Sequence, residues 1–408
     1  MRRKRILHLI NTLSSGGAER QLVTYLRQES MQRYENIVVL LDVENVDSLS
    51  SENLLVPEIK EHGIQVFGLG LSGAGNWIRA VRKLRKRLKA EPVDLIHTNL
   101  LGPNVVGRLV GYFTGIPVLT TYHNQDYSPE ATVFHFSGSR LKLKVMRQVD
   151  SFLAKRACPR VIAVSKCVAD HIVNHIGYPS SQIRLINYPV DPRHMQIVEP
   201  NPKSWVRQNL GIGSETSILI DVCRLVYQKN LPRLLDAFQS VLKMYPNTHL
   251  VILGSTQNTL VYKEVCDRII ELGLSEKVHI PGPTIDVSSW LAGSDIFVFP
   301  SLVEGMPIAL AESMSLGLPC ISSHVGPIPE MIVNRENGLL VDPLSTQEIT
   351  TAICELLSNP ALSKQLGNAA KATADNLFDP YRQTQKLIAV YEEIFAETGR
   401  KSKPAKRL

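Results

Sequence analysis

The stretch that decides the fold is DIFVFPSLVEGMPIALAESMSLGLPCISS, residues 295–323. The apolar run 296–299 predicts a strand, and a short loop follows it. Pro307 then suits the start of a helix, because its missing N–H would have no intrahelical partner there. Gly317 ends that helix, and the chain returns as a second apolar run at 320–322. The stretch therefore predicts a strand–loop–helix–strand unit of an α/β fold.

Two carboxylates flank the start of this predicted helix. Glu304 lies in the loop, and Glu312 lies about 8 Å along the helix axis from Pro307. The unpaired N–H groups and the positive dipole end of the helix suit a phosphate group in the same space. Carboxylates do not bind phosphate, but they accept hydrogen bonds from hydroxyl groups. The pattern therefore fits a diphosphate that carries a sugar at each end.

The segment Glu304-GMPIALA-Glu312 resembles the E-x7-E signature of retaining glycosyltransferases of family 4, which have the GT-B fold. Two glutamates eight residues apart are by themselves more typical of a solvated helix face. The resemblance therefore rests also on the EGMP start and on the SMSLGLPCISS that follows. It implies an α/β protein in which two Rossmann-like domains face each other across a cleft. It also implies transfer of a sugar from a nucleotide diphosphate sugar with retention at the anomeric carbon.

Length and composition are those of an ordinary globular protein with two domains. The 408 residues are 44% hydrophobic and 20% charged, and the formal net charge is +7. This moderate basicity suits an anionic ligand or an anionic membrane surface, and it is too weak to predict a nucleic-acid partner. No apolar run approaches the roughly 18 residues that a membrane span requires.

The six cysteines are scattered without a C-x-x-C pair, and most lie in apolar runs. This usage is typical of free thiols in a reducing compartment. The basic residues 2–5 precede an apolar run that breaks at Asn11, which is too short for a signal peptide. We therefore expect a cytoplasmic protein, either free or held peripherally on the inner face of the membrane.

Apolar runs that alternate with helical patterns predict a parallel sheet in each half of the chain. The predicted strands are 5–10, 37–41, 64–67, 93–97, 117–121, 161–164, 183–186, 217–223, 250–254, 296–299 and 320–322. We expect an N-terminal domain on the acceptor side at 1–190, a proline-rich linker at 191–204 and a donor-binding domain at 205–378. A last helix at 379–398 is expected to cross back to the first domain, as in GT-B proteins, before a basic tail at 399–408.

Two features of the first half suggest ligand contacts. Gly16 and Gly17 lie between the first predicted strand and a helix, which is the outline of a phosphate-binding loop. A plain turn is the alternative, but the phrase GGAER resembles the family's N-terminal loop. His123 follows the strand at 117–121, at the kind of strand end where ligands bind in open α/β sheets. A lone histidine is more often structural, but the family has a functional histidine at the matching place.

The loop after the strand at 217–223 carries two cations, Arg224 and Lys229. Two cations at a helix N-terminus can hold a diphosphate without a metal. The loop resembles the family's G-R-L-x-x-x-K-G, with Cys223 and Asn230 in place of glycines, so its charge is kept while its shape stays open. We also expect Asn230 to cap the helix that follows.

The resemblance implies roles for these residues. The expected donor-binding residues are Gly16, Gly17, Arg224, Lys229, Met306, Ile308 and Glu312. The expected catalytic residues are His123, Glu304, Arg224 and Lys229. Glu304 would bind the transferred sugar, Glu312 would bind the ribose, and the two cations would stabilise charge on the departing diphosphate. No metal and no other cofactor is expected, and no residue stands out as a covalent nucleophile.

Residues 77–89 carry seven basic side chains and no acidic one. One face of the predicted helix holds Trp77, Ile78, Val81, Leu84 and Leu88. The plain interpretation packs that face on the sheet and leaves the charges in solvent. The alternative places the helix against anionic lipid headgroups, and the basic stretches 140–147 and 400–407 fit it.

The motifs identify a family but not a substrate. Uridine diphosphate as the carrier follows family habit, and the basic helix suits a sugar or lipid-linked sugar acceptor in polysaccharide or glycolipid synthesis. Three rival functions stay open: an epimerase of the same fold, a non-catalytic partner that binds nucleotide sugar in a larger complex, and a nucleic-acid binder. The nucleic-acid binder is the least favoured, because aromatic residues do not interleave with the basic ones.

Overall fold

The computed structural model describes residues 2–14, 16–47, 50, 53–128, 140–256, 259–284 and 286–401. It consists of two compact units. The first combines the chain up to Pro189 with the segment from Pro380 onward, and the second holds the residues between them. Residues 191–204, expected as a linker, belong to the second unit, and residues 402–408 of the basic tail lie outside the described residues.

The first unit is built on a seven-stranded parallel sheet in the order β3-β2-β1-β4-β5-β6-β7. Its strands are β1 (Arg5–Ile10), β2 (Glu35–Leu40), β3 (Gln65–Gly68), β4 (Leu95–Asn99), β5 (Val118–Tyr122), β6 (Arg160–Ala163) and β7 (Ile183–Leu185). The central strands β4 and β5 are buried along their whole length. Near-continuous burial of this kind is typical of parallel strands that helices cover on both faces.

All but one of the following helices of the first unit connect successive parallel strands. The helices are α1 (Gly17–Arg27), α2 (Val56–Glu61), α3 (Trp77–Ala90), α4 (Leu101–Thr114), α6 (Arg140–Ala157), α7 (Lys166–His171) and α16 (Pro380–Lys401). Shorter helical turns lie at Glu29–Arg33, Ala74–Asn76, Ile172–Ile176 and Ser180–Gln182. The alternation of strand and helix along the chain is that of a Rossmann-like unit.

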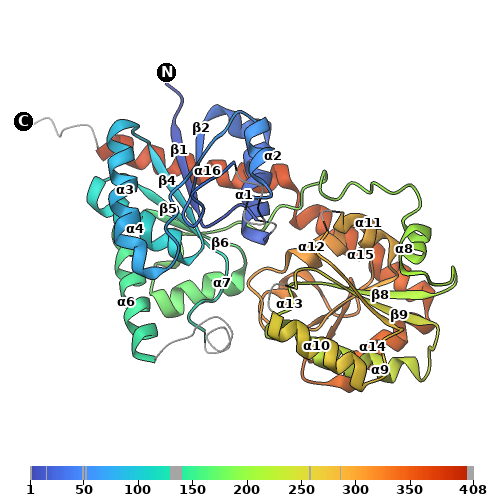
Figure 1. Cartoon of the computed structure of the whole chain (residues 1–408). Coiled ribbons are helices and arrows are strands. Elements are labelled where there is room, and N and C mark those ends of the chain that lie inside the picture. Colours follow the sequence, from blue (N-terminus) through green and yellow to red (C-terminus); the bar gives the residue numbers. More distant parts are fainter. Residues whose placement is uncertain are drawn as a thin grey trace, which may run out of the picture. The chain divides into compact units, whose positions relative to one another are not determined.

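The exception to this alternation is α16, which returns to the first unit from the far end of the chain (red in Figure 1). The hydroxyl of Tyr391 lies 2.8 Å from Nδ1 of His97 in β4. Glu393 accepts hydrogen bonds from Arg184 (2.8 Å) and Arg160 (3.1 Å), and Arg184 above all lowers the pKa of the Glu393 carboxyl. These contacts join α16 to β4, β6 and β7.

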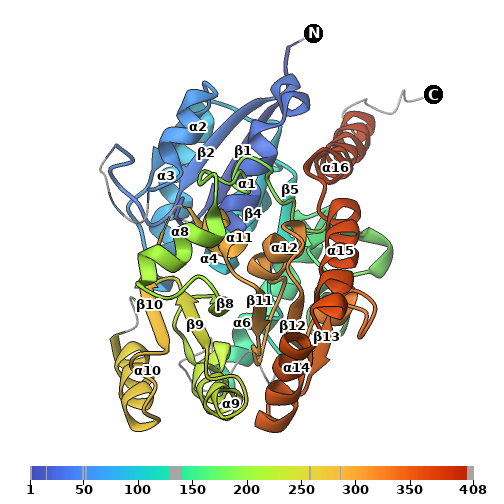
Figure 2. The same cartoon turned by 90° about the vertical axis from the view of Figure 1, so that its right-hand side faces the viewer.

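The second unit has a six-stranded parallel sheet in the order β10-β9-β8-β11-β12-β13 (Figure 2). Its strands are β8 (Ser217–Val222), β9 (Thr248–Leu253), β10 (Val278–Gly282), β11 (Ile296–Phe299), β12 (Cys320–Ser323) and β13 (Leu339–Val341). Its helices are α8 (Pro202–Leu210), α9 (Leu231–Leu242), α10 (Thr259–Glu271), α11 (Val287–Gly293), α12 (Ile308–Ser315), α13 (Ile328–Met331), α14 (Thr346–Ser358) and α15 (Pro360–Leu377). A short turn at Tyr227–Lys229 precedes α9.

The apolar runs predicted the strands closely, since each run forms a strand whose ends lie within two residues of the expected ones. Three details of the helices differ. Pro307 is the N-cap of α12 in extended backbone rather than its first helical residue. The α16 helix runs to Lys401, past the predicted end. The predicted apolar face of α3 is wrong at Ile78, which is exposed because it lies about 100° around the helix from Trp77.

All six cysteines are free thiols, as predicted, and three of them are buried. Among the helices in the described part of the chain, none is both long and apolar enough to cross a bilayer.

Candidate active site

The loops that carry the predicted second-unit residues follow β8 and β11, which are neighbours in the sheet. From β8 the chain builds the sheet outward through β9 and β10, and it then returns to place β11 on the other side of β8. The strand order therefore reverses between β8 and β11. In open parallel sheets, ligands bind at the carboxyl ends of the strands at such a point.

Lys229 and Glu304 meet at this point as an ion pair, with Nζ 2.6 Å from Oε1. Both side chains are nearly buried, and the hydroxyl of Ser301 donates to the same carboxylate oxygen at 2.6 Å. The ammonium of Lys229 also lies 4.6 Å from the centre of the Phe299 ring, which is a cation–π distance. Residues at the end of β11 therefore fix the position of both charges.

Asn230 keeps the loop in shape at a position where the family motif has glycine. Its φ of 59° and ψ of 32° are left-handed, a conformation that asparagine adopts more readily than most residues. Its Nδ2 donates to the carbonyls of Pro300 (3.2 Å) and Pro343 (2.7 Å). Asn230 is the N-cap of α9, as predicted, but its side chain makes no capping bond, because it ties this loop to the loops after β11 and β13.

Arg224 does not join the buried pair. Its side chain is exposed, whereas the backbone on either side is fixed: Leu225 donates its N–H to Ser255 (3.0 Å). The preceding residue, Cys223, is buried, and its carbonyl lies so close to Gly254 that an added Cβ there would be 1.9 Å away. The structure thus brings Lys229 and Glu304 together and leaves the Arg224 guanidinium at the surface of the same loop.

A further ionisable group lies close to this ion pair, and the sequence analysis did not single it out. Asp221, in β8, is fully buried, and apart from the Cys223 thiol no described group hydrogen-bonds its carboxylate. Burial raises the pKa of Asp221 to about 7, the nearby Lys229 ammonium opposes this rise, and Glu304 adds to it. An acid that interrupts the apolar run SILIDV was the one available signal. Its meaning depended on which side chains the fold places next to it.

The helix α12 presents the second expected carboxylate. Glu312 is buried in its second turn, and Met306 is buried just before it. Because Pro307 has no N–H, the hydrogen-bond donors at this helix start come from Met306 and from Ile308 onward. One strand–loop–helix unit thus holds two carboxylates and a helix N-terminus, beside a lysine from the neighbouring strand end. This set suits an anionic ligand that also carries hydroxyl groups.

In the first unit, Gly16 is the N-cap of α1, and Gly17, expected in the preceding loop, is the first residue of the helix. Glu19 folds over this loop: a Cβ added to Gly16 would lie 2.4 Å from its carboxylate. The hydroxyls of Thr12 and Ser14 donate to the same carboxylate at 3.3 Å each. The start of α1 therefore carries its own anion, and a phosphate that bound there would meet Glu19.

His123, at the end of β5, is buried with both ring nitrogens engaged. Nδ1 lies 2.6 Å from the hydroxyl of Tyr188, and Nε2 lies 3.1 Å from Oδ1 of Asn99. Burial lowers the pKa of His123 to about 3, so the ring is neutral at working pH. A ligand that used this histidine would have to displace one of the two partners.

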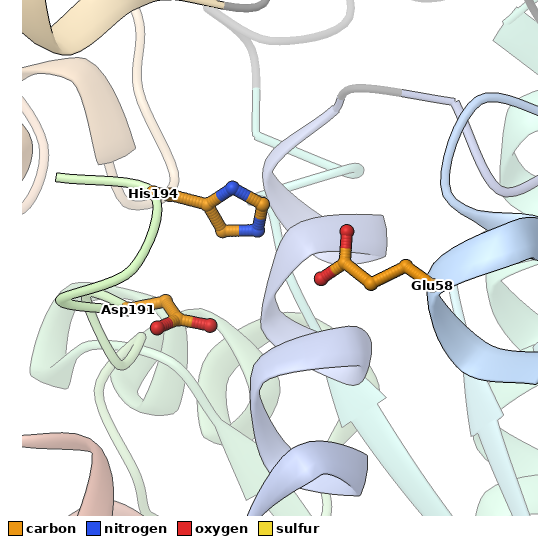
Figure 3. A group of neighbouring side chains, drawn as sticks. All are labelled: Glu58, Asp191 and His194. Carbon is orange, nitrogen blue, oxygen red and sulfur yellow. The ribbon is translucent and has the colours of Figure 1, made fainter. Parts of the chain in front are cut away.

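Three side chains that metals favour are labelled in Figure 3. Asp191 and His194 lie on the turn that opens the second unit, and Glu58 belongs to α2 of the first unit. Within its own unit, Glu58 pairs with Arg27. Within the second unit, Asp191 accepts a hydrogen bond from the N–H of Arg193 at 2.9 Å. Each carboxylate is thus engaged in its own unit, and we assign no metal to them.

Comparison with known families identifies both halves of the chain. The family described as Glycosyltransferase Family 4 matches residues 15–194, and the family described as Glycosyl transferases group 1 matches residues 203–373. A galactosyltransferase of Escherichia coli, named UDP-Gal:alpha-D-GlcNAc-diphosphoundecaprenol alpha-1,3-galactosyltransferase, is 24% identical and covers 78% of this chain and 80% of its own. The N-acetyl-alpha-D-glucosaminyl L-malate synthase of Bacillus anthracis is 23% identical and covers 79% of this chain and 80% of its own.

Solved structures show the fold. Anabaena Alr3699/HepE in complex with UDP-glucose has a TM-score of 0.82 at 23% identity, covering 95% of this chain and 99% of that one. WaaG, a glycosyltransferase involved in lipopolysaccharide biosynthesis, has a TM-score of 0.70 at 16% identity, covering 93% and 98%. The two parallel α/β sheets of this chain are those of a GT-B protein, as predicted.

Proposed function

Because this chain belongs to the glycosyltransferases of group 1 and family 4, we propose that it transfers a hexose from a UDP-sugar to a hydroxyl acceptor with retention of the anomeric configuration. The observation that carries the proposal is the buried Lys229–Glu304 pair at the point where the strand order reverses. It places a cation for a diphosphate next to a carboxylate for sugar hydroxyls. The choice of uridine is supported by the UDP-glucose bound to Alr3699/HepE.

In the proposed reaction, the bond between the anomeric carbon and the diphosphate oxygen breaks, and its electron pair leaves with UDP. The acceptor hydroxyl attacks the same face of the sugar, and its proton passes to the departing diphosphate. Charge grows on that diphosphate, so Lys229 and Arg224 act by stabilising it, together with the amides of Met306 and Ile308. No metal is required, since these groups supply the positive field that a metal would provide.

The remaining roles divide between the two carboxylates and the first unit. Glu304 would release Lys229 and accept hydrogen bonds from the transferred sugar, and Glu312 would hold the ribose. Gly16 and Gly17 would border the diphosphate, in which case Glu19 has to move away from the loop. His123 would orient sugar and phosphate after giving up one of its present partners.

The proposed acceptor is a lipid-linked sugar in polysaccharide or glycolipid assembly on the cytoplasmic face of a membrane. Two relatives support this class of acceptor: the Escherichia coli enzyme is named for a diphosphoundecaprenol acceptor, and WaaG for lipopolysaccharide biosynthesis. The basic helix α3 agrees with an acceptor presented at an anionic surface.

The decisive experiment incubates the full chain with a panel of UDP- and GDP-sugars and measures thermal shift, free nucleotide and sugar products. We expect one UDP-sugar to raise the melting temperature and to be hydrolysed slowly without acceptor. A new sugar isomer from the donor alone would identify an epimerase instead. Binding without any hydrolysis would identify a non-catalytic partner. Once an acceptor is found, the anomeric coupling constant of the product tests retention.

A further inference from the structure

The helix α6 has two apolar faces, and only one of them is covered. Its inner face buries Leu153 and Ala154 and holds Asp150 in a buried ion pair with Arg108. Its outer face carries four apolar side chains at helical spacing, namely Leu141, Val145, Val149 and Phe152. Their exposed fractions lie between 44% (Val149) and 71% (Leu141). Positions i, i+4, i+8 and i+11 share one side of a helix, so these side chains form one continuous stripe.

The stripe continues onto α4, which packs beside α6 (Figure 1). The last turn of α4 exposes Tyr112 and Phe113, whose rings meet edge to face at 5.5 Å. The Tyr112 ring lies 6.3 Å from the ring of Phe152. We call the six residues Leu141, Val145, Val149, Phe152, Tyr112 and Phe113 the α4–α6 surface. A contiguous exposed patch of this kind marks an interaction site, whereas single exposed apolar residues are ordinary.

Basic residues of α3 and α6 border this surface, and we call them its positive frame. The guanidinium of Arg85, in α3, lies 5.1 Å from the Phe113 ring, and that of Arg156, in α6, lies 5.5 Å from the Phe152 ring. The α3 helix has seven basic residues and no acidic one. The α6 helix has six basic residues, and its one acid, Asp150, is the buried partner of Arg108. The described charges of these two helices that face solvent are therefore all positive.

We propose that the α4–α6 surface docks this protein on an anionic phospholipid bilayer, with its apolar side chains among the acyl chains and the cations of α3 and α6 at the headgroups. Aromatic and aliphatic groups flanked by Lys and Arg have the composition that binds at a membrane interface. The anionic leaflet complements the positive frame. A symmetric contact with a second copy would instead bring two positive frames together. A nucleic acid would leave the aliphatic stripe without a partner, because its bases stack on aromatic side chains.

The test measures co-sedimentation of the full chain with vesicles of phosphatidylcholine alone and with vesicles containing about one part in three of phosphatidylglycerol. We expect binding to the anionic vesicles and little binding to the neutral ones. The double variant Phe113→Ser/Phe152→Ser should weaken binding about tenfold or more, because both rings lose apolar contact. The variant Lys86→Glu/Lys155→Glu should weaken it by a similar factor through charge alone.

Matched controls come from exposed residues of the second unit. Met244→Ser/Ile270→Ser removes two exposed apolar side chains, and Lys243→Glu/Lys364→Glu reverses two exposed charges. Both controls should bind anionic vesicles as the natural protein does. A Phe152→Trp variant gives a direct readout, since the indole emission should shift to the blue on vesicles. Unchanged melting temperature and donor hydrolysis would show that each variant is folded.

Several outcomes would overturn the proposal. One is full vesicle binding by the two α4–α6 variants, and another is equal loss of binding by the second-unit controls. A third is a dimer in lipid-free solution that the Phe113→Ser/Phe152→Ser change dissociates, because the surface would then belong to a second copy. Vesicle binding is measured without donor or acceptor, so its failure is distinguishable from a failure of the transferase proposal.

Discussion

Lys229 and Glu304, which follow different strands of the second sheet, form an ion pair with Nζ 2.6 Å from Oε1. The cation proposed for the diphosphate is therefore already engaged by the carboxylate proposed for the sugar. A donor must exchange this internal ion pair for its own contacts, with diphosphate replacing Glu304 beside Lys229. The Lys229–Glu304 ion pair thus holds both side chains in place, and it also competes with the donor for them.

This competition predicts opposite effects of Glu304→Gln on binding and on transfer. The amide keeps the size of the side chain and its contact with Ser301 but releases the charge of Lys229. We expect UDP to bind roughly threefold to tenfold more tightly, as a charge-assisted partner is freed. Sugar transfer should fall about 10–100-fold, because hydrogen bonds to the transferred sugar are weakened. Calorimetry with UDP and a transfer assay measure the two effects, and weaker UDP binding with intact transfer would contradict the competition.

Lys229→Ala should lower turnover about 10²–10³-fold, the usual loss when one donor to a developing anion is removed. Lys243→Ala, at an exposed lysine that ends α9, is the matched control and should leave turnover unchanged. Steady-state kinetics with the identified UDP-sugar gives the comparison. Turnover near that of the natural protein would remove Lys229 from the proposed role.

Asp221 predicts a dependence of stability on pH. Burial raises its pKa in the folded protein to about 7, from 3.8 when exposed. The folded protein then holds the proton more tightly, so this group's contribution to stability is complete below about pH 4 and is lost as pH rises to about 7. Asp221→Asn should therefore raise the free energy of unfolding at pH 8 by a few kcal/mol, on the order of 1.4 kcal/mol per pKa unit, and should change it little at pH 4. Urea unfolding at both values measures this, and an equal effect at both would refute the assignment.

The buried histidines of the first unit predict the opposite trend. Burial lowers the pKa of His8 to about 4, opposed by its hydrogen bond with Asn36, and lowers that of His123 to about 3. The unfolded chain then takes up protons that the folded unit refuses, so stability is complete above about pH 6.5 and falls toward pH 4. His8→Gln should lose less stability between pH 7 and pH 5 than the natural protein does, by about 2 kcal/mol. Chemical unfolding followed by circular dichroism provides the comparison, and equal losses would contradict it.

Much of the fold could be predicted from the sequence because many of its strands contain uninterrupted apolar runs. The runs in β2 and β11 mark these strands without knowledge of their neighbours, and glycines and prolines mark where strands end. The side that a helix buries was harder to predict, as Ile78 shows. On α6 the covered and the exposed apolar residues follow one helical period, and only tertiary contacts tell the two faces apart.

The site could be predicted in part. The resemblance singled out Lys229 and Glu304, and the order of the strands explains why they meet, since β8 and β11 are adjacent although 75 residues separate the two side chains. Asp221 and Glu19 were missed because their importance depends on which groups the fold places next to them, namely Lys229 and Glu304 beside Asp221 and the Gly16 loop beside Glu19. An acid in a strand or at a helix start is ordinary until another charged group is found within reach.

The placement of α16 has a consequence for biosynthesis. The ribosome makes β1 to β7 first, and the helix that supplies Tyr391 and Glu393 to them is made only after the second unit. The second unit is contiguous and is complete before that helix emerges. The contacts of the first unit with α16 can therefore form only after the second unit has been made, and a chain that stopped before Pro380 would lack the partners of His97 and Arg184 on α16.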